Sequence, residues 1–369
     1  MSFPEIKKNF GFGCMRLPMK DDQVDYEEFN RMIDAFIDAG FNYFDTAHGY
    51  IGGKSELAIR DCLAARYPRE KFLLANKLTH PYFETEADVR PFFMDQLDRC
   101  GVEYFDFYLF HTLNATNYKK HKACKTFETV KQLKEEGKIR HIAMSFHDTA
   151  DVLDMILSEQ GEIIEAVQLQ FNYLDYDDPG VQSKKCYDVA VKHGKKVLIM
   201  EPVKGGVLVN LPDEAAKKLS ALTDKSQASF AIRYAASFPE VVMVLSGMGN
   251  MDMMNDNIST MRDFVPLSET EINATEDLRE TIRRVRQIQC TKCEYCVDGC
   301  PAGIKIPYVF ANYNNYLAAK ITRREAKENQ PTDSATPDAC IKCGACEEIC
   351  PQSLPIRELL EQIAERYSW

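Results

Sequence analysis

Near its C-terminus the chain contains the same cysteine spacing twice. The pattern Cys-x2-Cys-x2-Cys-x3-Cys-Pro occurs first at Cys290, Cys293, Cys296 and Cys300, and again at Cys340, Cys343, Cys346 and Cys350. Four thiolates at this spacing are typical of a [4Fe–4S] cluster. The two runs therefore predict two such clusters in a protein that handles electrons.

Two other uses of cysteine compete with this interpretation. A structural zinc site takes four ligands, usually from two separated Cys-x2-Cys pairs, whereas each run here is complete in itself. Disulfides belong mainly to small secreted domains. The remaining five cysteines show no spacing pattern and are expected to be reduced and mostly buried: Cys14, Cys62, Cys100, Cys124 and Cys186.

In two-cluster modules the fourth cysteine of each run usually binds the other cluster. On that rule, one cluster takes Cys350 together with the first three cysteines of the first run. The other cluster takes Cys300 together with the first three cysteines of the second run. If each cluster instead uses the fourth cysteine of its own run, the eight ligands are the same.

Composition is ordinary for a soluble globular protein, with 27% charged and 45% hydrophobic residues among 369. A net charge of −11 argues against nucleic acid as a main partner, because phosphate backbones attract basic surfaces. The first ten residues lack the apolar segment of a signal peptide, and no apolar run reaches the length of a membrane span. We therefore expect a cytoplasmic protein without a membrane partner.

Residues 11–263 alternate between short apolar runs and longer stretches of helical periodicity. The expected strands are 14–17, 42–45, 72–76, 105–110, 141–145, 166–170, 197–200 and 241–245. The expected helices are 26–39, 55–65, 89–99, 126–136, 151–158, 185–193, 227–237 and 251–261. Apolar strands that alternate with helices indicate a parallel sheet. Eight such units predict a closed (β/α)8 TIM barrel, with an open doubly wound sheet as the alternative.

These patterns divide the chain into three parts. The barrel is assigned to 1–269, a charged linker helix to 270–289, and a ferredoxin-type iron–sulfur domain to 290–369. Between the cysteine runs, 306–327 carries aromatic residues and alanine at helical spacing, and 328–337 is a polar loop with two prolines. This interval favours a small, mainly helical domain. The cysteine run is the only duplicated motif that the sequence shows.

Four polar residues stand at or just beyond the ends of three successive expected strands: Asp45, Tyr50, Lys77 and His111. Active sites of TIM barrels lie at this C-terminal face. A lysine ammonium beside a tyrosine lowers the tyrosine pKa, and an aspartate would hold that lysine in place. A histidine can orient a substrate carbonyl by a hydrogen bond. The four residues are suited to protonate a carbonyl oxygen while hydride reaches its carbon.

Each of these residues has a structural alternative when it is taken alone. His111 would more often be a buried histidine with satisfied hydrogen bonds, and Asp45 is compatible with a helix cap. Four such residues on three neighbouring strands make coincidence the weaker explanation. Candidates for lining the substrate pocket, with ordinary packing as the alternative, are Phe12, His48, Tyr82, Phe83 and His147.

The motifs around these residues resemble those of the aldo/keto reductase superfamily. Asp45-Thr46-Ala47-x-x-Tyr50 matches its signature, and Lys77 and His111 complete its catalytic tetrad. The similarity runs over about residues 10–263. With the added cysteine module, the whole chain resembles the ferredoxin-fused branch of that superfamily. The resemblance implies that Tyr50 is the general acid or base and that the substrate is a small carbonyl compound or alcohol.

The resemblance also implies a nicotinamide dinucleotide, NAD(P)H, across the barrel mouth. Ser145 and Gln168 match positions that hold its carboxamide. The loop that usually covers its pyrophosphate corresponds to Pro202, Gly205 and Gly206. The adenosine half is expected at Ser246, Gly247, Met248 and Asn257.

Three positions depart from the family pattern. Phe146-His147 stands where an asparagine usually follows the carboxamide serine, and Met200 replaces the aromatic residue that stacks on the nicotinamide. No lysine or arginine lies between Ser246 and Asn257, where a 2′-phosphate is usually held by such a cation. A tight preference for NADP is therefore not expected, and a flavin in place of the nicotinamide stays an alternative.

The two halves differ in how many electrons they transfer. A [4Fe–4S] cluster exchanges one electron, whereas a nicotinamide transfers a hydride, and a flavin is the usual converter. The favoured hypothesis is an NAD(P)H-dependent carbonyl reductase whose clusters serve electron transfer or structure. One alternative is an oxidoreductase linked to a ferredoxin or another electron-transfer protein, with flavin or an external donor replacing NAD(P)H. A third is a non-catalytic redox sensor or subunit.

Overall fold

The computed structural model describes residues 3–285, 288–317 and 320–367. Contacts within the chain divide it into two compact units. The first consists of Met1–Asp178, Gln182–Pro202 and Ala228–Ser268, and the second of Pro179–Val181, Val203–Gln227 and Glu269–Trp369. The second unit thus combines the C-terminal region with a segment from within the expected barrel domain. The sequence-based domain boundaries differ from this grouping at that segment and stay a prediction.

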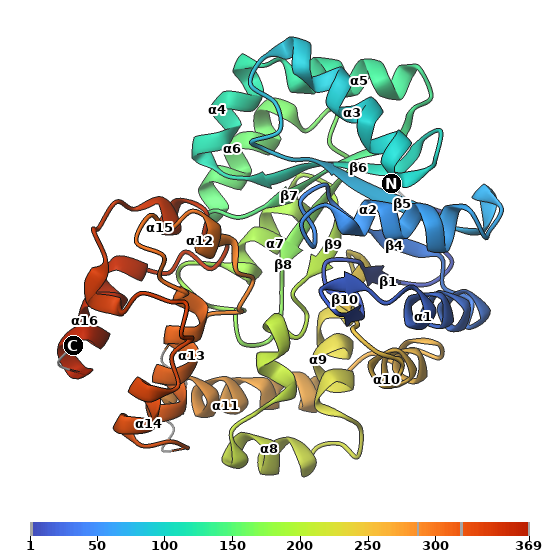
Figure 1. Cartoon of the computed structure of the whole chain (residues 1–369). Coiled ribbons are helices and arrows are strands. Elements are labelled where there is room, and N and C mark those ends of the chain that lie inside the picture. Colours follow the sequence, from blue (N-terminus) through green and yellow to red (C-terminus); the bar gives the residue numbers. More distant parts are fainter. Residues whose placement is uncertain (1–2, 286–287, 318–319, 368–369) are drawn as a thin grey trace. The chain divides into compact units, whose positions relative to one another are not determined.

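The first unit contains a closed barrel of eight parallel strands in the order β1-β10-β9-β8-β7-β6-β5-β4 (Figure 1). The strands are β1 Phe10–Gly13, β4 Tyr43–Asp45, β5 Leu73–Leu78, β6 Phe105–Leu113, β7 Ile139–Phe146, β8 Ala166–Gln170, β9 Lys196–Met200 and β10 Val241–Gly247. Every residue of β4, β5 and β8 is buried, as expected for a parallel sheet covered on both faces. The predicted TIM barrel is confirmed.

The helices of the barrel follow the predicted alternation. They are α1 Tyr26–Asp38, α2 Lys54–Ile59, α3 Glu86–Cys100, α4 Ala115–Ala123, α5 Thr126–Glu135, α6 Ala150–Gln160, α7 Ser183–Lys192, α9 Gln227–Ala236 and α10 Met251–Met261. Helix α4 and the short hairpin β2 Met19–Lys20 and β3 Gln23–Val24 were not expected. Among the described residues, no helix is both long enough and apolar enough to cross a membrane.

The first strand lies four residues earlier than the sequence predicted. The expected strand was 14–17, but β1 spans Phe10–Gly13 and residues 14–16 form a turn. Glycine at an interior position explains the error, because glycine is disfavoured in most strands. A Cβ added at Gly11 would lie 2.7 Å from Leu245 Cδ2 and 2.8 Å from Met243 Sδ. Neighbouring strands therefore fill the space that a β1 side chain would need.

The barrel interior is filled by one apolar cluster. Its members come from β4 to β10 and from the N-terminal segment: Phe3, Tyr43, Leu73, Ala75, Phe107, Leu109, Ala143, Ala166, Leu198, Met243 and Leu245. Because these residues come from strands all around the barrel, they form a packed core rather than a channel. This core supports the strand ends that carry the polar residues described below.

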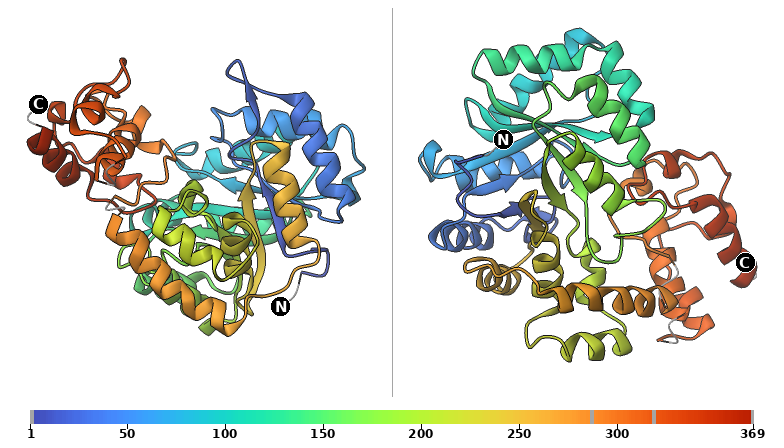
Figure 2. Two further views of the ribbon diagram at one scale, coloured as in Figure 1. Left: turned by 90° about the horizontal axis from the view of Figure 1, so that it is seen from below. Right: turned by 180° about the vertical axis from the view of Figure 1, so that it is seen from behind.

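The regular elements of the second unit's described residues are all helices, and its C-terminal helices are coloured orange to red in Figures 1 and 2. Its elements are the 3-10 segment η3 Lys204–Val209, α8 Asp213–Ser220, α11 Glu269–Val285, α12 Tyr295–Asp298, α13 Ile306–Leu317, α14 Arg323–Glu328, the 3-10 turn η4 Pro337–Ala339, α15 Ala345–Glu348 and α16 Ile356–Tyr367. The predicted mainly helical cluster domain is confirmed. Helix α11 corresponds to the expected linker helix, of which residues 286–287 lie outside the described part.

The cysteine module is duplicated well beyond its cysteines. Helices α12 and α13 have counterparts 50 residues later in α15 and α16. Left-handed backbone conformations recur at the same offset, in the pairs Lys292 and Lys342, Glu294 and Gly344, and Gly303 and Ser353. The sequence revealed the repeat only at the cysteine runs, because two of these three pairs share backbone geometry but not side-chain type.

Candidate functional site

A buried ion pair joins the ends of two neighbouring barrel strands. Asp45 is the last residue of β4, and Asp45 Oδ1 is 2.5 Å from the Nζ atom of Lys77 on β5. The same ammonium donates a hydrogen bond of 2.8 Å to the Thr46 carbonyl oxygen. Burial lowers the pKa of Lys77, and the charge of Asp45 opposes this shift. The structure thus brings these two predicted residues together, with the aspartate holding the lysine.

Tyr50 lies in the loop after β4, next to this pair. The Lys77 Nζ atom is 4.8 Å from the centroid of the Tyr50 ring. Burial, and then the charge of Asp45, raise the pKa of Tyr50 well above its ordinary value. This result differs from the expectation that Lys77 lowers the tyrosine pKa, because the ammonium is hydrogen-bonded to Asp45 and Thr46 and lies over the ring. Tyr50 is therefore a neutral phenol that retains its proton.

His111, near the end of β6, completes the group. Its ring centroid is 6.1 Å from that of Tyr50, in an edge-on arrangement. The His111 Nδ1 atom is 2.8 Å from Thr79 Oγ1, so Nε2 is the ring nitrogen left for a ligand. Burial, and then the charges of Lys77 and His147, hold the pKa of His111 well below its ordinary value. The imidazole is therefore neutral, and Thr79 is a positioning residue that the sequence analysis missed.

A buried polar network supports the strand end that carries Lys77. Gln96 Nε2 donates to the Lys77 carbonyl oxygen at 3.0 Å and to Asn76 Oδ1 at 3.1 Å, and it is within 3.3 Å of Glu56 Oε1. The Tyr108 hydroxyl donates to Gln96 Oε1 at 2.6 Å, and Asn76 Nδ2 donates to Glu56 Oε1 at 2.9 Å. Satisfied networks of this kind rigidify their surroundings. The sequence analysis missed it because its members come from four elements without a shared motif.

Of the five predicted pocket-lining residues, His147 is half-buried and lies near enough to His111 for its charge to lower the pKa of His111, and the other four fall into two groups. Phe12 is fully buried in an aromatic cluster with side chains of α1, and Phe83 is buried against His121, so both serve ordinary packing. His48 and Tyr82 form an edge-on pair with ring centroids 4.5 Å apart, and Tyr82 is 45% exposed. This second pair is accessible to a ligand.

Two of the predicted nicotinamide-binding residues are neighbours in the barrel. Ser145 on β7 is in register with Gln168 on β8. The Ser145 hydroxyl oxygen accepts a hydrogen bond of 2.7 Å from the Thr112 N–H. Gln168 Nε2 is 3.3 Å from Asp45 Oδ2. Gln168 therefore contacts the Asp45–Lys77 pair with Ser145 on the neighbouring strand, and the binding of a carboxamide by these two residues stays a prediction.

The residues expected at the adenosine end also gather in one place. Asn257 Nδ2 donates to Ser246 Oγ at 3.2 Å, Met248 is buried, and Gly247 is exposed. The aliphatic stem of Arg16 lies beside this group, because a Cβ added at Gly247 would be 3.4 Å from Arg16 Cβ and 3.8 Å from Arg16 Cδ. Arg16 comes from the loop after β1, far in sequence from residues 246–257. The binding of an adenosine by these residues stays a prediction.

The glycine loop expected at the pyrophosphate divides between the two units. Pro202 is the last residue of its segment in the first unit, whereas Gly205 and Gly206 belong to the second unit. Their φ angles are 59° and 94°, which favour glycine. A Cβ added at Gly205 would lie 2.5 Å from the Thr291 carbonyl oxygen. Packing against the first cysteine loop accounts for this glycine, and the role of Gly205 and Gly206 at a pyrophosphate stays a prediction.

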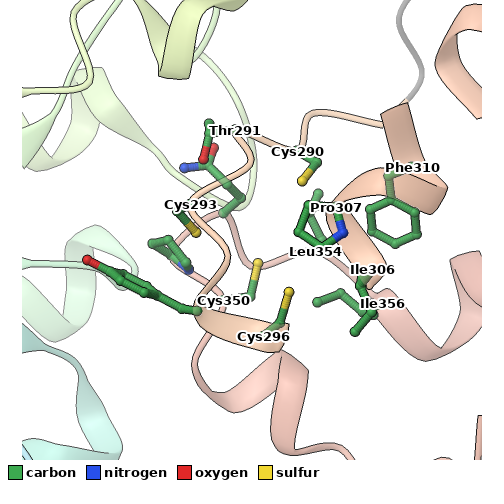
Figure 3. Close-up of a pocket in the computed structure, with 13 residues that line it drawn as sticks. Cys290, Thr291, Cys293, Cys296, Ile306, Pro307, Phe310, Cys350, Leu354 and Ile356 are labelled. Carbon is green, nitrogen blue, oxygen red and sulfur yellow. The ribbon is translucent and has the colours of Figure 1, made fainter. Parts of the chain in front are cut away.

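Each cysteine pocket is bordered by three cysteines of one run and the fourth cysteine of the other. Cys290, Cys293, Cys296 and Cys350 line the first pocket, and Cys340, Cys343, Cys346 and Cys300 line the second. Figure 3 shows the four sulfur atoms of the first pocket turned toward a common space. No three His, Cys, Asp or Glu side chains of the described residues converge closely enough for a single metal ion. The thiols border cavities instead. Their arrangement is the one required by the crossed ligand assignment, in which the fourth cysteine of each run binds the cluster of the other run.

The chemistry of these pockets fits an iron–sulfur cluster. Apolar side chains such as Ile306, Phe310 and Leu354 form the walls of the first pocket (Figure 3). Burial raises the pKa of the Cys350 thiol, while backbone N–H groups of residues 352–354 and the charge of Lys204 lower it. Backbone N–H groups directed at sulfur and a low-polarity wall are features that hold and tune such clusters.

Two family matches cover most of the chain. Residues 9–280 match the aldo/keto reductase family, and residues 289–354 match the 4Fe-4S dicluster domain. Oxidoreductase YqkF of Bacillus subtilis is 22% identical over 297 residues, which cover 72% of this chain and 90% of the relative. An aldo-keto reductase of Mycolicibacterium smegmatis is 25% identical over 241 residues, which cover 65% of this chain and 82% of the relative.

Solved structures share the barrel fold. The holo form of aldo-keto reductase AKR11C1 from Bacillus halodurans aligns with a TM-score of 0.61 at 24% identity, over 73% of this chain and 91% of that protein. An aldo-keto reductase from Klebsiella pneumoniae in complex with NADPH aligns with a TM-score of 0.60 at 19% identity, over 73% and 90%. Likeness at these identities establishes the common architecture.

Proposed function

We propose that this chain, which belongs to the aldo/keto reductase family and carries a 4Fe-4S dicluster domain, reduces a small carbonyl compound or oxidises the corresponding alcohol with a nicotinamide cofactor. The observation that supports this most is the grouping of Asp45, Tyr50, Lys77 and His111 at one rim of the barrel. A structural neighbour binds NADPH, which makes NADPH the first donor to test.

The residues of this site can handle the proton of such a reaction. A bound nicotinamide would supply the hydride. Tyr50 retains its proton because its pKa is raised, and it donates that proton from its hydroxyl to the carbonyl oxygen. The Thr79 hydroxyl holds the Nδ1 atom of His111 by a hydrogen bond of 2.8 Å, and Nε2 is the ring nitrogen left to orient the carbonyl. Lys77, held by Asp45, lies over the Tyr50 ring and fixes the position of that ring.

The two clusters are proposed to exchange single electrons with a ferredoxin or another electron-transfer protein. Cys343 is exposed, so the second cluster would be reachable by such a partner. One observation favours a second candidate function, in which a flavin or an external donor replaces NAD(P)H. The glycines expected at the pyrophosphate belong to the second unit, where Gly205 packs against Thr291 instead.

Replacement of the proposed proton donor tests the main proposal. Tyr50→Phe is expected to lower NADPH-dependent turnover of an aldehyde or ketone by roughly 10²- to 10⁴-fold, the range of general acid catalysis. Its visible cluster absorption should stay unchanged. Tyr104→Phe is a matched control, since Tyr104 precedes β6 and lies at the opposite end of that strand from His111. Equal turnover in Tyr50→Phe and wild type would refute the role of Tyr50.

An anaerobic titration separates the two candidate functions. Iron-reconstituted protein is titrated with NADH and with NADPH while the cluster absorption is followed. Bleaching would show redox contact between nicotinamide and clusters and would call for a search for bound flavin. Carbonyl turnover without bleaching would support a reductase whose clusters work separately. If NAD(P)H causes neither bleaching nor turnover while dithionite still reduces the clusters, the result would favour the second candidate function, in which a flavin or an external donor replaces NAD(P)H.

A further inference from the structure

A buried lysine from the segment after β9 reaches the cysteine module. Lys204 is 1% exposed, and its Nζ donates to Gln352 Oε1 at 2.8 Å. Gln352 follows Cys350 by two residues, and both line the first cysteine pocket. Although Lys204 and Gln352 are 148 positions apart, they belong to the same compact unit. The ammonium is therefore part of the structure around the first pocket.

The backbone around Lys204 is shaped to place it there. Lys204, Gly205 and Gly206 have φ angles of 46°, 59° and 94°, and a left-handed conformation is uncommon for a lysine. The Thr291 carbonyl oxygen would lie only 2.5 Å from a Cβ at Gly205. Thr291 is the residue after the first cysteine and is itself buried. The η3 segment is thus closely fitted to the loop that begins the first pocket.

The duplicated second pocket differs at these positions. The position equivalent to Gln352 is Ala302, and the position equivalent to Thr291 is Ile341, which is 67% exposed. The second pocket does have a cation in its lining, Arg357. That guanidinium is exposed and forms an ion pair of 2.7 Å with Glu347. The two pockets therefore place positive charge in different surroundings.

We propose that Lys204 tunes the first cluster, bound by Cys350 and the first three cysteines of the first run, by raising its reduction potential. Reduction adds one negative charge to a cluster, and a nearby cation stabilises the more negative state. The effect is strong where burial keeps water from screening the charge. The electron comes from an external reductant, and no bond to Lys204 forms or breaks. The inference rests on the crossed ligand assignment and not on carbonyl reduction.

The test is a potentiometric titration of the full, iron-reconstituted chain with dithionite, followed by electron paramagnetic resonance. Lys204→Met is expected to make reduction of one cluster about tenfold less favourable or more, which is 59 mV for a one-electron couple. The potential of the other cluster should stay the same. Lys204→Arg, which keeps the charge, should stay near wild type.

A second variant tests the proposal if the Lys204→Met protein does not bind iron. Gln352→Glu has the same shape and places a carboxylate against Lys204, so it should also lower the potential of one cluster. Lys218→Met is the matched control, because Lys218 lies in the same unit but lines neither pocket. Its ammonium pairs with Asp277 at 2.7 Å. Unchanged potentials in both Lys204→Met and Gln352→Glu would overturn the proposal, as would an equal shift in Lys218→Met.

This experiment is independent of catalysis. The potentials are measured without a carbonyl substrate and without a nicotinamide. A chain that reduces no carbonyl would still show the selective shift if Lys204 tunes the first cluster. A chain with full carbonyl turnover and unshifted potentials would refute the inference and leave the proposed function intact.

Discussion

The barrel site and the cysteine module hold their functional groups in different ways. At the barrel rim, the Lys77 ammonium, the Asp45 carboxylate and the His111 ring nitrogen each contact a protein side chain. In the module, eight thiols border two cavities with largely apolar walls. The barrel site is therefore complete without a ligand, whereas the module is built around groups that iron would join. Such metal binding contributes directly to folding free energy.

The largest expected effect comes from removing the cation of the barrel site. Lys77→Met leaves the buried Asp45 carboxylate without its partner, which costs about 3–5 kcal/mol of the free energy of unfolding. Because the partner is a protein group, the loss should be the same with and without iron. Denaturant unfolding of both forms measures it. The double variant Asp45→Asn/Lys77→Met should recover stability but not carbonyl turnover.

Pairs of cysteine variants test which cysteines of the module bind the same cluster. If the ligands cross between the runs, Cys293→Ala/Cys350→Ala damages one cluster and should keep about half of the iron. Cys293→Ala/Cys300→Ala should then lose both clusters. Iron analysis and cluster absorption give the answer. The opposite pattern would show that each cluster uses the fourth cysteine of its own run. Stability losses in these variants should appear only in iron-loaded protein.

Two adjacent glycines test how tightly η3 is fitted to the module. Gly205→Ala should cost about 1–3 kcal/mol from overpacking against Thr291, in addition to backbone strain. Gly206→Ala is the control, because nothing lies within 4 Å of its added Cβ and only the strain of about 1–2 kcal/mol applies. Unfolding of the iron-loaded chain compares the two. Equal losses would show that η3 is not closely packed at Gly205.

The smallest effect concerns a histidine of the barrel wall. His141 Nδ1 is 2.8 Å from Glu165, and His141 Nε2 contacts Glu5. Burial lowers the pKa of His141, but the hydrogen bonds and charges of Glu165 and Glu5 outweigh burial and raise it. Lys134 also pairs with Glu165 and limits this effect. A raised folded-state pKa stabilises the protein below the unfolded pKa of about 6.5, and this contribution is lost as the pH rises through the folded pKa.

Unfolding experiments over a pH series check this sign. His141→Gln should be less stable than wild type by about 1 kcal/mol or less near pH 6. The difference should shrink as the pH rises through the raised pKa of His141. A difference that grows with pH would contradict the direction of the shift. Because no thiol takes part, the result should be the same with and without iron.

Sequence reasoning succeeded in bringing together residues that lie at the ends of neighbouring strands. Asp45, Lys77 and His111 were found because parallel strands bring their carboxyl ends to one rim. It failed for Thr79 and for the Gln96 network, since these act through contacts between elements that share no motif. It also gave the wrong direction for the pKa of Tyr50, because burial and Asp45 outweigh the lysine.

For the module, the spacing of the cysteines alone predicted the 4Fe-4S dicluster domain that the family match confirms, since the distance between thiols along a chain limits the group they can hold. The alternation of apolar strands and helices likewise determined the barrel. Which fourth cysteine faces which pocket, and that Lys204 lies against Gln352, were decided only by the tertiary structure. Spacing acts over a few residues, whereas charge, burial and close packing act between residues that folding brings together from distant parts of the chain.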